Sequence, residues 1–346
     1  MTNSSIKFEN WPQRDRSAWQ AAIANGGILD DRGPAAHWAA ATRATNIHHC
    51  GRFLAFLDEQ KKLNPHLSLA RQCTPDNIQA YVKKLNTNVA PITVASSLIG
   101  LFVTVKVMAL DEDWKWLAHI CNVLKRNAKP QRNKRSRILS SVKIYKAALD
   151  ELRRLSTTDL NTRDQKVGFR NALMLGMLTV APIRLKNFAA LQPGFTLIKN
   201  GRTWLVTAHE SAVKNGTSIT LELPEDLALF VDIYLASVRP QLLGKNISEA
   251  LWLNWYGKEM TEHAIYLRFV KFTRRLLGRS INPHLLRDCA ATTLAMDSPS
   301  SAFAARGLLG HKRFSTTDKY YIHAQQLEAS RRVNELLAAL MVNGRK

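Results

Sequence analysis

The chain has 346 residues, of which 46% are hydrophobic. Its 49 Lys and Arg residues outnumber its 27 Asp and Glu residues, so the formal charge is +22 at pH 7. This composition excludes a disordered chain, and the length favours two domains over one. The positive charge predicts an anionic partner. Because the charge is spread along the chain and not along one amphipathic helix, it favours double-stranded DNA over a membrane surface.

The expected compartment follows from the apolar runs and the cysteines. No apolar run reaches the roughly 18 residues that span a bilayer, and the polar N-terminus does not resemble an export signal. The four cysteines form no CxxC pair, which is typical of reduced thiols in a cytosolic protein. We therefore expect a cytoplasmic, nucleoid-associated protein with no membrane partner.

Metal and nucleotide motifs are missing from the sequence. His48, His49 and Cys50 are adjacent, so their side chains point in different directions on a helix, and no second group is spaced to complete a zinc site. The sequence has no GxxxxGK[ST] loop. We expect neither a metal ion nor ATP or another cofactor.

The first third of the chain is predicted to be helical after a loose start. Residues 1–35 contain glycines, prolines and isolated charges, and we expect an N-terminal arm or loop there with one short helix near Trp19–Ala24. From residue 36 the apolar residues follow a helical spacing, and Thr74-Pro75 is typical of a helix start. Residues 36–124 are therefore predicted to form a small all-helical DNA-binding domain.

A basic segment follows over residues 125–138. Its first thirteen residues hold seven basic side chains and no acidic one, and Pro130 prevents a continuous helix. One interpretation is a solvated linker, and the other is a linker that contacts DNA phosphates. The candidate DNA contacts are Lys125, Arg126, Lys129, Arg132, Lys134, Arg135 and Arg137.

The rest of the chain, residues 139–346, is predicted to be a second domain of mainly helical structure. Arg163–Val180 is a strongly apolar helix. Three short β-rich stretches follow and are separated by Asn200-Gly201 and Asn215-Gly216, which are strong hairpin signals. The predicted fold class is therefore mainly α with a small antiparallel β-sheet, making an α+β second domain.

Six residues of this second domain can carry phosphodiester chemistry. Arginine grips two phosphate oxygens and stays cationic, so a pair of arginines can stabilise the charge of a transition state. A tyrosine hydroxyl is a competent nucleophile, and a histidine or lysine can protonate a leaving oxygen. None of these steps needs a metal. The residues are Arg184, Lys214, His284, Arg287, His311 and Tyr320.

Each of these residues taken alone has an ordinary structural explanation, and for each alone that explanation is favoured. Together they resemble a family. The stretches HLLRD at 284–288 and LLGHKRFSTTDKYY at 308–321 are similar to the motifs of the tyrosine recombinases, which include the phage integrases and Xer-type recombinases. The resemblance extends from about Ser140 to His323.

The resemblance implies a role for each residue. Arg184 is implied as the first catalytic arginine and Lys214 as the general acid for the 5′ oxygen. His284 and Arg287 match the family's His-x-x-Arg box. His311 matches the second histidine. Tyr320 matches the nucleophile.

The resemblance also implies a mechanism and an assembly. It implies cleavage and rejoining of DNA through a 3′-phosphotyrosine, without metal or ATP. It implies a protein that is a monomer when free and forms a homotetramer on two DNA sites, with a Holliday-junction intermediate. The first domain would correspond to the family's SAM-like core-binding domain, and the two domains would form a clamp around the duplex.

The sequence departs from the family in three places. Val180-Ala181-Pro182 replaces the usual Thr-Gly turn before the first arginine, and Asn187 stands where an acidic residue is common. Tyr321 follows Tyr320 directly and is the alternative nucleophile.

Three alternatives remain open at this point. The protein can be a catalytically silent DNA-binding accessory factor, although the complete residue set argues against it. It can resemble a type IB topoisomerase, although the small first domain argues against that. The predicted helix from about Ala324 to Val342 can pack on its own domain or on a neighbouring subunit. The sequence favours neither position over the other.

Overall fold

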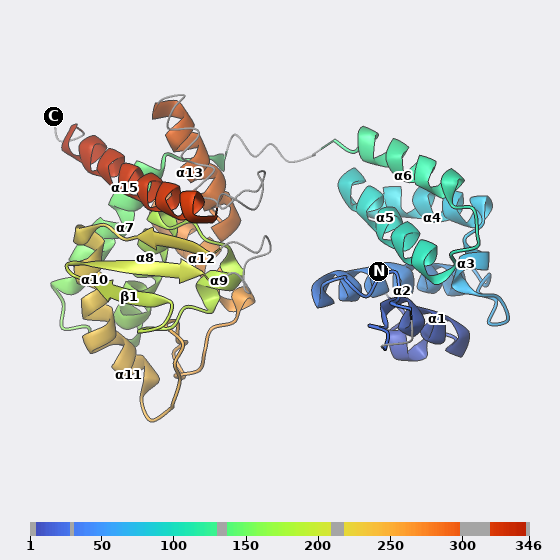
Figure 1. Cartoon of the computed structure of the whole chain (residues 1–346). Coiled ribbons are helices and arrows are strands. Elements are labelled where there is room, and N and C mark those ends of the chain that lie inside the picture. Colours follow the sequence, from blue (N-terminus) through green and yellow to red (C-terminus); the bar gives the residue numbers. More distant parts are fainter. Residues whose placement is uncertain (1–4, 28–30, 130–136, 209–217, 298–318, 344–346) are drawn as a thin grey trace. The chain divides into compact units, whose positions relative to one another are not determined.

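The computed structural model describes residues 5–27, 31–129, 137–208, 218–297 and 319–343, and for residues 291, 294–297, 319–328 and 342–343 it describes the backbone alone. The chain divides into two compact units, which are drawn in Figure 1. We refer to Met1–Asn133 as the N-terminal unit and to Lys134–Lys346 as the C-terminal unit.

The N-terminal unit is helical throughout its described residues. Its elements are the short helix η1 (Phe8–Asn10), α1 (Gln13–Ile23), α2 (Ala40–Glu59), α3 (Leu69–Gln72), α4 (Pro75–Asn88), α5 (Pro91–Met108) and α6 (Lys115–Asn127). The predicted start of α4 is confirmed, because the Thr74 hydroxyl accepts a hydrogen bond from the Asn77 amide and Pro75 is the first helical residue. Phe53 and Leu98 are fully buried where α2 and α5 meet.

Helix α1 belongs to the packing of this unit, whereas the sequence placed it in an arm of residues 1–35. Trp19 of α1 is 1% exposed. The Asp15 carboxylate accepts a hydrogen bond of 2.8 Å from the amide of Leu69, the first residue of α3. The glycines on the C-terminal side of α1 favoured a loop in the sequence. The contacts that hold α1 in place come from residues far away in the chain.

Helix α5 is long and apolar enough to cross a membrane by length and composition. Its 18 residues have a mean hydropathy of 1.7, and 44% of them are buried. Polar residues such as Ser96, Ser97 and Thr104 interrupt its apolar residues, which is why no apolar run of this length is apparent in the sequence. Val94 and Leu101 of α5 lie in the core of the N-terminal unit.

The basic segment begins inside a helix. Lys125 and Arg126 lie in the last turn of α6, where their charge complements the helix dipole. Arg137 donates a hydrogen bond of 3.0 Å to the carbonyl oxygen of Ser280 in the C-terminal unit. The candidate contacts Arg132, Lys134 and Arg135 lie outside the described residues.

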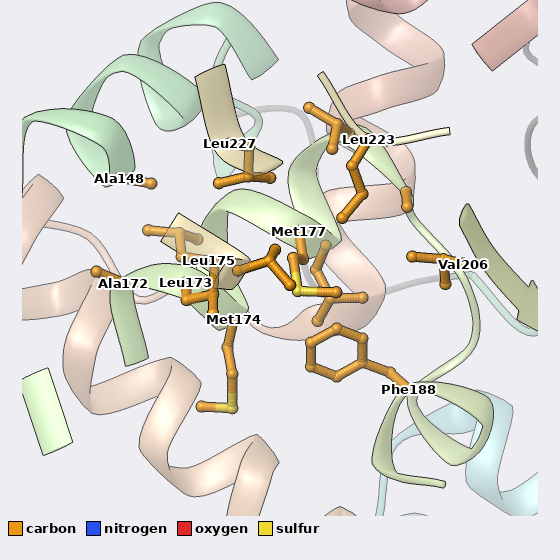
Figure 2. Close-up of a cluster of buried hydrophobic side chains, with 14 of the residues drawn as sticks. Ala148, Ala172, Leu173, Met174, Leu175, Met177, Phe188, Val206, Leu223 and Leu227 are labelled. Carbon is orange, nitrogen blue, oxygen red and sulfur yellow. The ribbon is translucent and has the colours of Figure 1, made fainter. Parts of the chain in front are cut away.

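The C-terminal unit is built around one apolar helix. Its elements are α7 (Ser141–Ser156), α8 (Arg163–Val180), α9 (Leu185–Ala189), β1 (Leu197–Asn200), β2 (Thr203–Ala208), β3 (Ile219–Glu222), α10 (Glu225–Ile233), the π-helical turn η4 (Tyr234–Val238), α11 (Arg239–Leu243), α12 (Glu262–Leu277), α13 (Pro283–Asp297) and α15 (Lys319–Asn343). Every residue of α8 from Gly168 to Val180 is buried. Figure 2 shows Leu173 and Met177 of α8 among side chains from the sheet and from the surrounding helices.

The three strands form an antiparallel sheet in the order β1-β2-β3. Asn200 pairs with Thr203 across the first turn, and Gly201 takes a φ of +58° there, a conformation that glycine adopts without strain. The predicted first hairpin is therefore confirmed. The predicted Asn215-Gly216 turn lies outside the described residues.

Helix α15 packs against the unit from which it extends. Val333 and Leu337 are buried in the main core of the C-terminal unit. The Ser330 hydroxyl donates to the carbonyl oxygen of Glu222 and accepts from its amide, both at 3.0 Å, which fixes α15 along the edge strand β3. Of the two positions left open by the sequence, the structure therefore shows residues 329–341 on their own unit (Figure 1).

Candidate active site

Arg184 lies in the break between α8 and α9. Helix α8 ends at Val180, and Pro182 lacks an amide hydrogen to continue it. Ile183 is buried and anchors the segment, whereas Arg184 is half-buried with an extended backbone at φ −65° and ψ 144°. The guanidinium is thus carried by a short segment that two packed helices hold at both ends.

His284 and Arg287 lie in the first turns of α13. The Asn282 carboxamide oxygen accepts a hydrogen bond of 2.8 Å from the Leu285 amide, and Pro283 is the first helical residue, so both features define where α13 begins. His284 is exposed, while Arg287 is 6% exposed. The helix therefore presents an accessible imidazole one turn before a buried guanidinium.

The structure brings the two arginines together. Arg287 donates a hydrogen bond from Nη1 to the carbonyl oxygen of Pro182, two residues before Arg184. The pKa of Arg287 is lowered to about 10, mainly by burial and also by the nearby charge of Arg184, while the adjacent Asp288 carboxylate offsets part of the effect. Two like charges are thus held near each other on a hydrogen-bonded scaffold.

Buried polar atoms without partners gather beside this pair. Within the described residues, Nη1 of Arg184 has no hydrogen-bond acceptor, and neither amide atom of Asn187 has a partner. Asn187 is 5% exposed and lies one helical turn beyond Arg184. Unsatisfied buried donors are costly, and an incoming anion with several oxygens can satisfy them. The sequence marked Asn187 as a departure from a family pattern, but its unpaired amide is visible in the tertiary structure alone.

The structure does not describe the side chains of the other predicted site residues. Tyr320 and the alternative Tyr321 lie in the first turn of α15, where the structure describes the backbone. Lys214 and His311 lie outside the described residues. Of the predicted site residues, the structure therefore describes the side chains of Arg184, His284 and Arg287.

The described residues contain no group of three or more His, Cys, Asp or Glu side chains arranged to hold a metal ion. The surroundings of His49 and Cys50 indicate that both side chains contribute to packing. Its side chain packs against Gly100 of α5, and burial lowers its pKa below the ordinary histidine value. Cys50 is buried in the same core.

The Phage integrase family model matches residues 148–328, just over half of the 346 residues. The chain therefore belongs to the phage integrase family. It is similar to the tyrosine recombinase XerD of Staphylococcus aureus, with 26% identity over 192 residues that cover 52% of this chain and 58% of that protein. XerD of Staphylococcus saprophyticus is 32% identical over 108 residues, which cover 31% of this chain and 36% of that protein. The chain thus matches little more than half the length of the first of these relatives.

Two solved structures share the fold. One is the site-specific recombinase XerH bound to palindromic difH substrate in a post-cleavage complex, with a TM-score of 0.52 and 14% identity over 82% of this chain and 75% of that chain. The other is a lambda integrase dimer bound to a COC′ core site, with a TM-score of 0.50 and 15% identity over 92% of this chain and 78% of that chain. The predicted fold class, mainly helical with a small antiparallel sheet, is confirmed.

Proposed function

We propose that this protein is a site-specific DNA recombinase that cleaves and rejoins strands through a 3′-phosphotyrosine. Membership of the phage integrase family supports the class. The single observation that carries the proposal is the arginine pair, because Arg287 is tied to the segment that carries Arg184. A scissile phosphate is the anion for which such a pair is suited.

The arginine pair would act mainly in the transition state. When a nucleophile attacks the phosphorus, charge grows on the non-bridging oxygens, and guanidinium groups already in position need no reorganisation. Arg184 has a free donor at Nη1 for one such oxygen, as judged from the described residues. The hydrogen bond from Arg287 to the Pro182 carbonyl holds the second guanidinium close to the segment that carries Arg184.

The remaining predicted residues complete a balanced reaction. The Tyr320 hydroxyl loses its proton and forms a bond to phosphorus, while the bond from phosphorus to the 5′ oxygen breaks. Lys214 supplies the proton that makes the leaving group a 5′ hydroxyl, and His284 and His311 hold and move protons around the phosphate. A 5′ hydroxyl from a partner strand then reverses the step and restores Tyr320. The phosphotyrosine conserves the bond energy, so no step requires ATP or a metal.

The partner of this protein is proposed to be double-stranded DNA in the cytoplasm. The charge of +22 supports binding to DNA. Both units contribute in this proposal, with residues 36–124 as the helical DNA-binding domain, 125–138 as the basic linker and 139–346 as the catalytic domain. Strand exchange between two sites needs four active sites, and we therefore propose a homotetramer on DNA that forms from free monomers.

Covalent trapping tests the proposal. The probe is a set of duplexes made from the DNA that flanks the gene, each nicked so that the cleaved end diffuses away. We expect a protein–DNA adduct that survives denaturation and maps to the peptide containing Tyr320. DNA binding without any adduct would instead indicate a silent accessory factor. Relaxation of supercoiled plasmids without a specific site would indicate a topoisomerase.

A further inference from the structure

The C-terminal unit has a polar cavity, which we call the arginine pocket. It has a volume of about 560 Å³ and lies between the start of α8, the turn at residues 254–260 and α12. Its lining includes Arg163, Arg170, Arg268, Trp255 and Tyr256. Asp164 is the acidic residue in the lining, so three arginines face one carboxylate.

Arg170 is buried with neutral partners. It is 2% exposed, and its guanidinium donates to the Asn171 carboxamide oxygen and to the Leu253 carbonyl oxygen at 2.6–3.2 Å. Its pKa is lowered to about 10, mainly by burial and also by the nearby charge of Arg268, while Tyr234 offsets part of the effect. A buried charge is costly unless an opposite charge compensates it. The described part of the chain provides no ion pair for Arg170 or Arg268.

The pocket has an aromatic wall and a hydrogen-bonded turn. The Arg163 guanidinium lies over the Trp255 ring at 5.0 Å from its centroid. The Asn254 side chain accepts hydrogen bonds from the Tyr256 and Lys258 amides, which holds the turn in place. Tyr256 is 71% exposed, so an apolar surface is available beside the positive charge.

The pocket is separate from the candidate active site. It lies at the N-terminal end of α8, whereas Arg184 follows the C-terminal end of the same helix. Helix α8 has 18 residues, which corresponds to about 27 Å at 1.5 Å per residue. A scissile phosphate at Arg184 would therefore leave the arginine pocket unoccupied.

The N-terminal unit carries a segment of the opposite character, which we call the acidic loop. Leu110–Asp113 connects α5 to α6, and Asp111–Asp113 is the one run of three consecutive acidic residues in the sequence. All three carboxylates are exposed, and Leu110 is 67% exposed. The salt bridges between described residues involve none of these carboxylates.

The acidic loop is preformed by hydrogen bonds at its base. Trp114 donates from Nε1 to the Ala109 carbonyl oxygen at 2.9 Å, and the Asp113 carboxylate accepts from the Lys115 amide at 2.9 Å. Little conformational entropy therefore remains to be lost when the loop binds a partner.

We propose that the arginine pocket binds the acidic loop of a second copy of this chain. Asp111 and Glu112 would pair with Arg268 and Arg163, and Leu110 would lie on the apolar wall at Tyr256. A chain with a charge of +22 repels its own copies. Pairing of the acidic loop with the arginine pocket lowers the repulsion between two copies in one relative orientation. That orientation is therefore favoured over the others. The contact would give DNA-bound copies a fixed neighbour without using the candidate active site.

Thiol cross-linking between two differently tagged full-length variants tests the contact. One chain carries Leu110→Cys and the other carries Tyr256→Cys, and a short bifunctional maleimide joins them. The native cysteines Cys50, Cys73, Cys121 and Cys289 are all buried. We expect a heterodimer band several-fold stronger than that given by Leu110→Cys with Leu229→Cys, whose site on α10 is 59% exposed.

A charge swap makes the test specific. Adding Arg268→Glu to the pocket chain should reduce the band to the control level, whereas Arg274→Glu on the exposed end of α12 should leave it unchanged. Adding Asp111→Arg to the other chain should then restore part of the band. Equal bands for Tyr256→Cys and Leu229→Cys would overturn the proposal, as would insensitivity to Arg268→Glu. The cross-linking is carried out on the full-length proteins bound to duplex DNA, because the free chain is proposed to be a monomer. It requires no cleavage, so its failure is distinct from failure of the proposed function.

Discussion

Arg287 of α13 donates a hydrogen bond to the carbonyl oxygen of Pro182, although the two residues are 105 positions apart in the chain. Pro182 also lies just after the end of α8, where the chain turns into the segment that carries Arg184. The residue next to the helix end therefore also accepts the hydrogen bond from the second arginine. The position of one arginine thereby depends on the position of the other. Catalytic groups must be held within a fraction of an ångström, and a shared backbone contact is one way to achieve this.

This relationship predicts that Arg287→Lys abolishes cleavage even though the charge is kept. An ammonium is a point donor and does not reproduce the guanidinium fork that reaches the Pro182 carbonyl and a phosphate together. We expect cleavage of a nicked duplex to fall by about 10²–10³-fold or more, while DNA binding changes little. The measurement is single-turnover cleavage alongside a binding titration. Arg274→Lys serves as the matched control on α12.

The assignment of the nucleophile is tested with two adjacent substitutions. Tyr320→Phe keeps the ring and removes the hydroxyl, so we expect it to bind DNA but form no covalent adduct. Tyr321→Phe should still form the adduct. Denaturing gels of both variants on the nicked duplex give the answer. The reverse pattern would move the nucleophile to Tyr321, the neighbouring residue in the first turn of α15.

Removal of divalent metals should leave cleavage intact. The proposed steps use arginines for charge stabilisation and protein side chains for proton transfer, so they need no Lewis acid. We expect the same rate of adduct formation with and without excess EDTA. A rate that collapses in EDTA and recovers with Mg²⁺ would count against the proposed mechanism.

The basic linker should contribute to affinity through phosphates. Each phosphate contact contributes roughly −0.9 to the slope of log K against log salt. Changing Arg132, Lys134 and Arg135 to Gln should flatten this slope, and by the same amount on specific and random DNA, because phosphate contacts carry little sequence information. Arg137 is kept because it bonds to Ser280.

A salt titration of DNA binding measures the slope. The control removes equal charge from exposed positions of the C-terminal unit, Lys245, Lys258 and Lys271. An unchanged slope in the linker variant would mean that the segment is a solvated connection. A loss confined to specific DNA would mean that some of these side chains read bases.

The position of α15 predicts a stability effect. Ser330→Ala removes the hydroxyl that bonds to both backbone groups of Glu222, and it leaves a partly buried amide without its partner. Loss of such a partner costs about 1–3 kcal/mol, and we expect thermal unfolding to shift down by several degrees. Arg332→Ala, at an exposed position of the same helix, should have little effect. If Ser330→Ala unfolds like the unaltered protein, α15 contributes little to its own unit.

The sequence determined the fold class and the candidate residues because both are written in local patterns. Apolar spacing predicted α8, Thr74-Pro75 predicted the start of α4, and Asn200-Gly201 predicted the hairpin turn. These signals depend on neighbours within a few positions, so one sequence is enough to recognise them.

The tertiary structure decided the burial and the contacts that involve residues far apart in the chain. Trp19 has no local signal for burial, yet it is 1% exposed and its ring lies beside that of Trp38, so α1 packs into the N-terminal unit. Ser330 is an ordinary polar helix residue until β3 presents the backbone of Glu222 to it. The sequence named Arg184 and Arg287, but their mutual charge effect and the bond to Pro182 exist because packing brings α13 against the end of α8. Long-range contacts of this kind are set by the shape of the whole core, and no short stretch of sequence contains that shape.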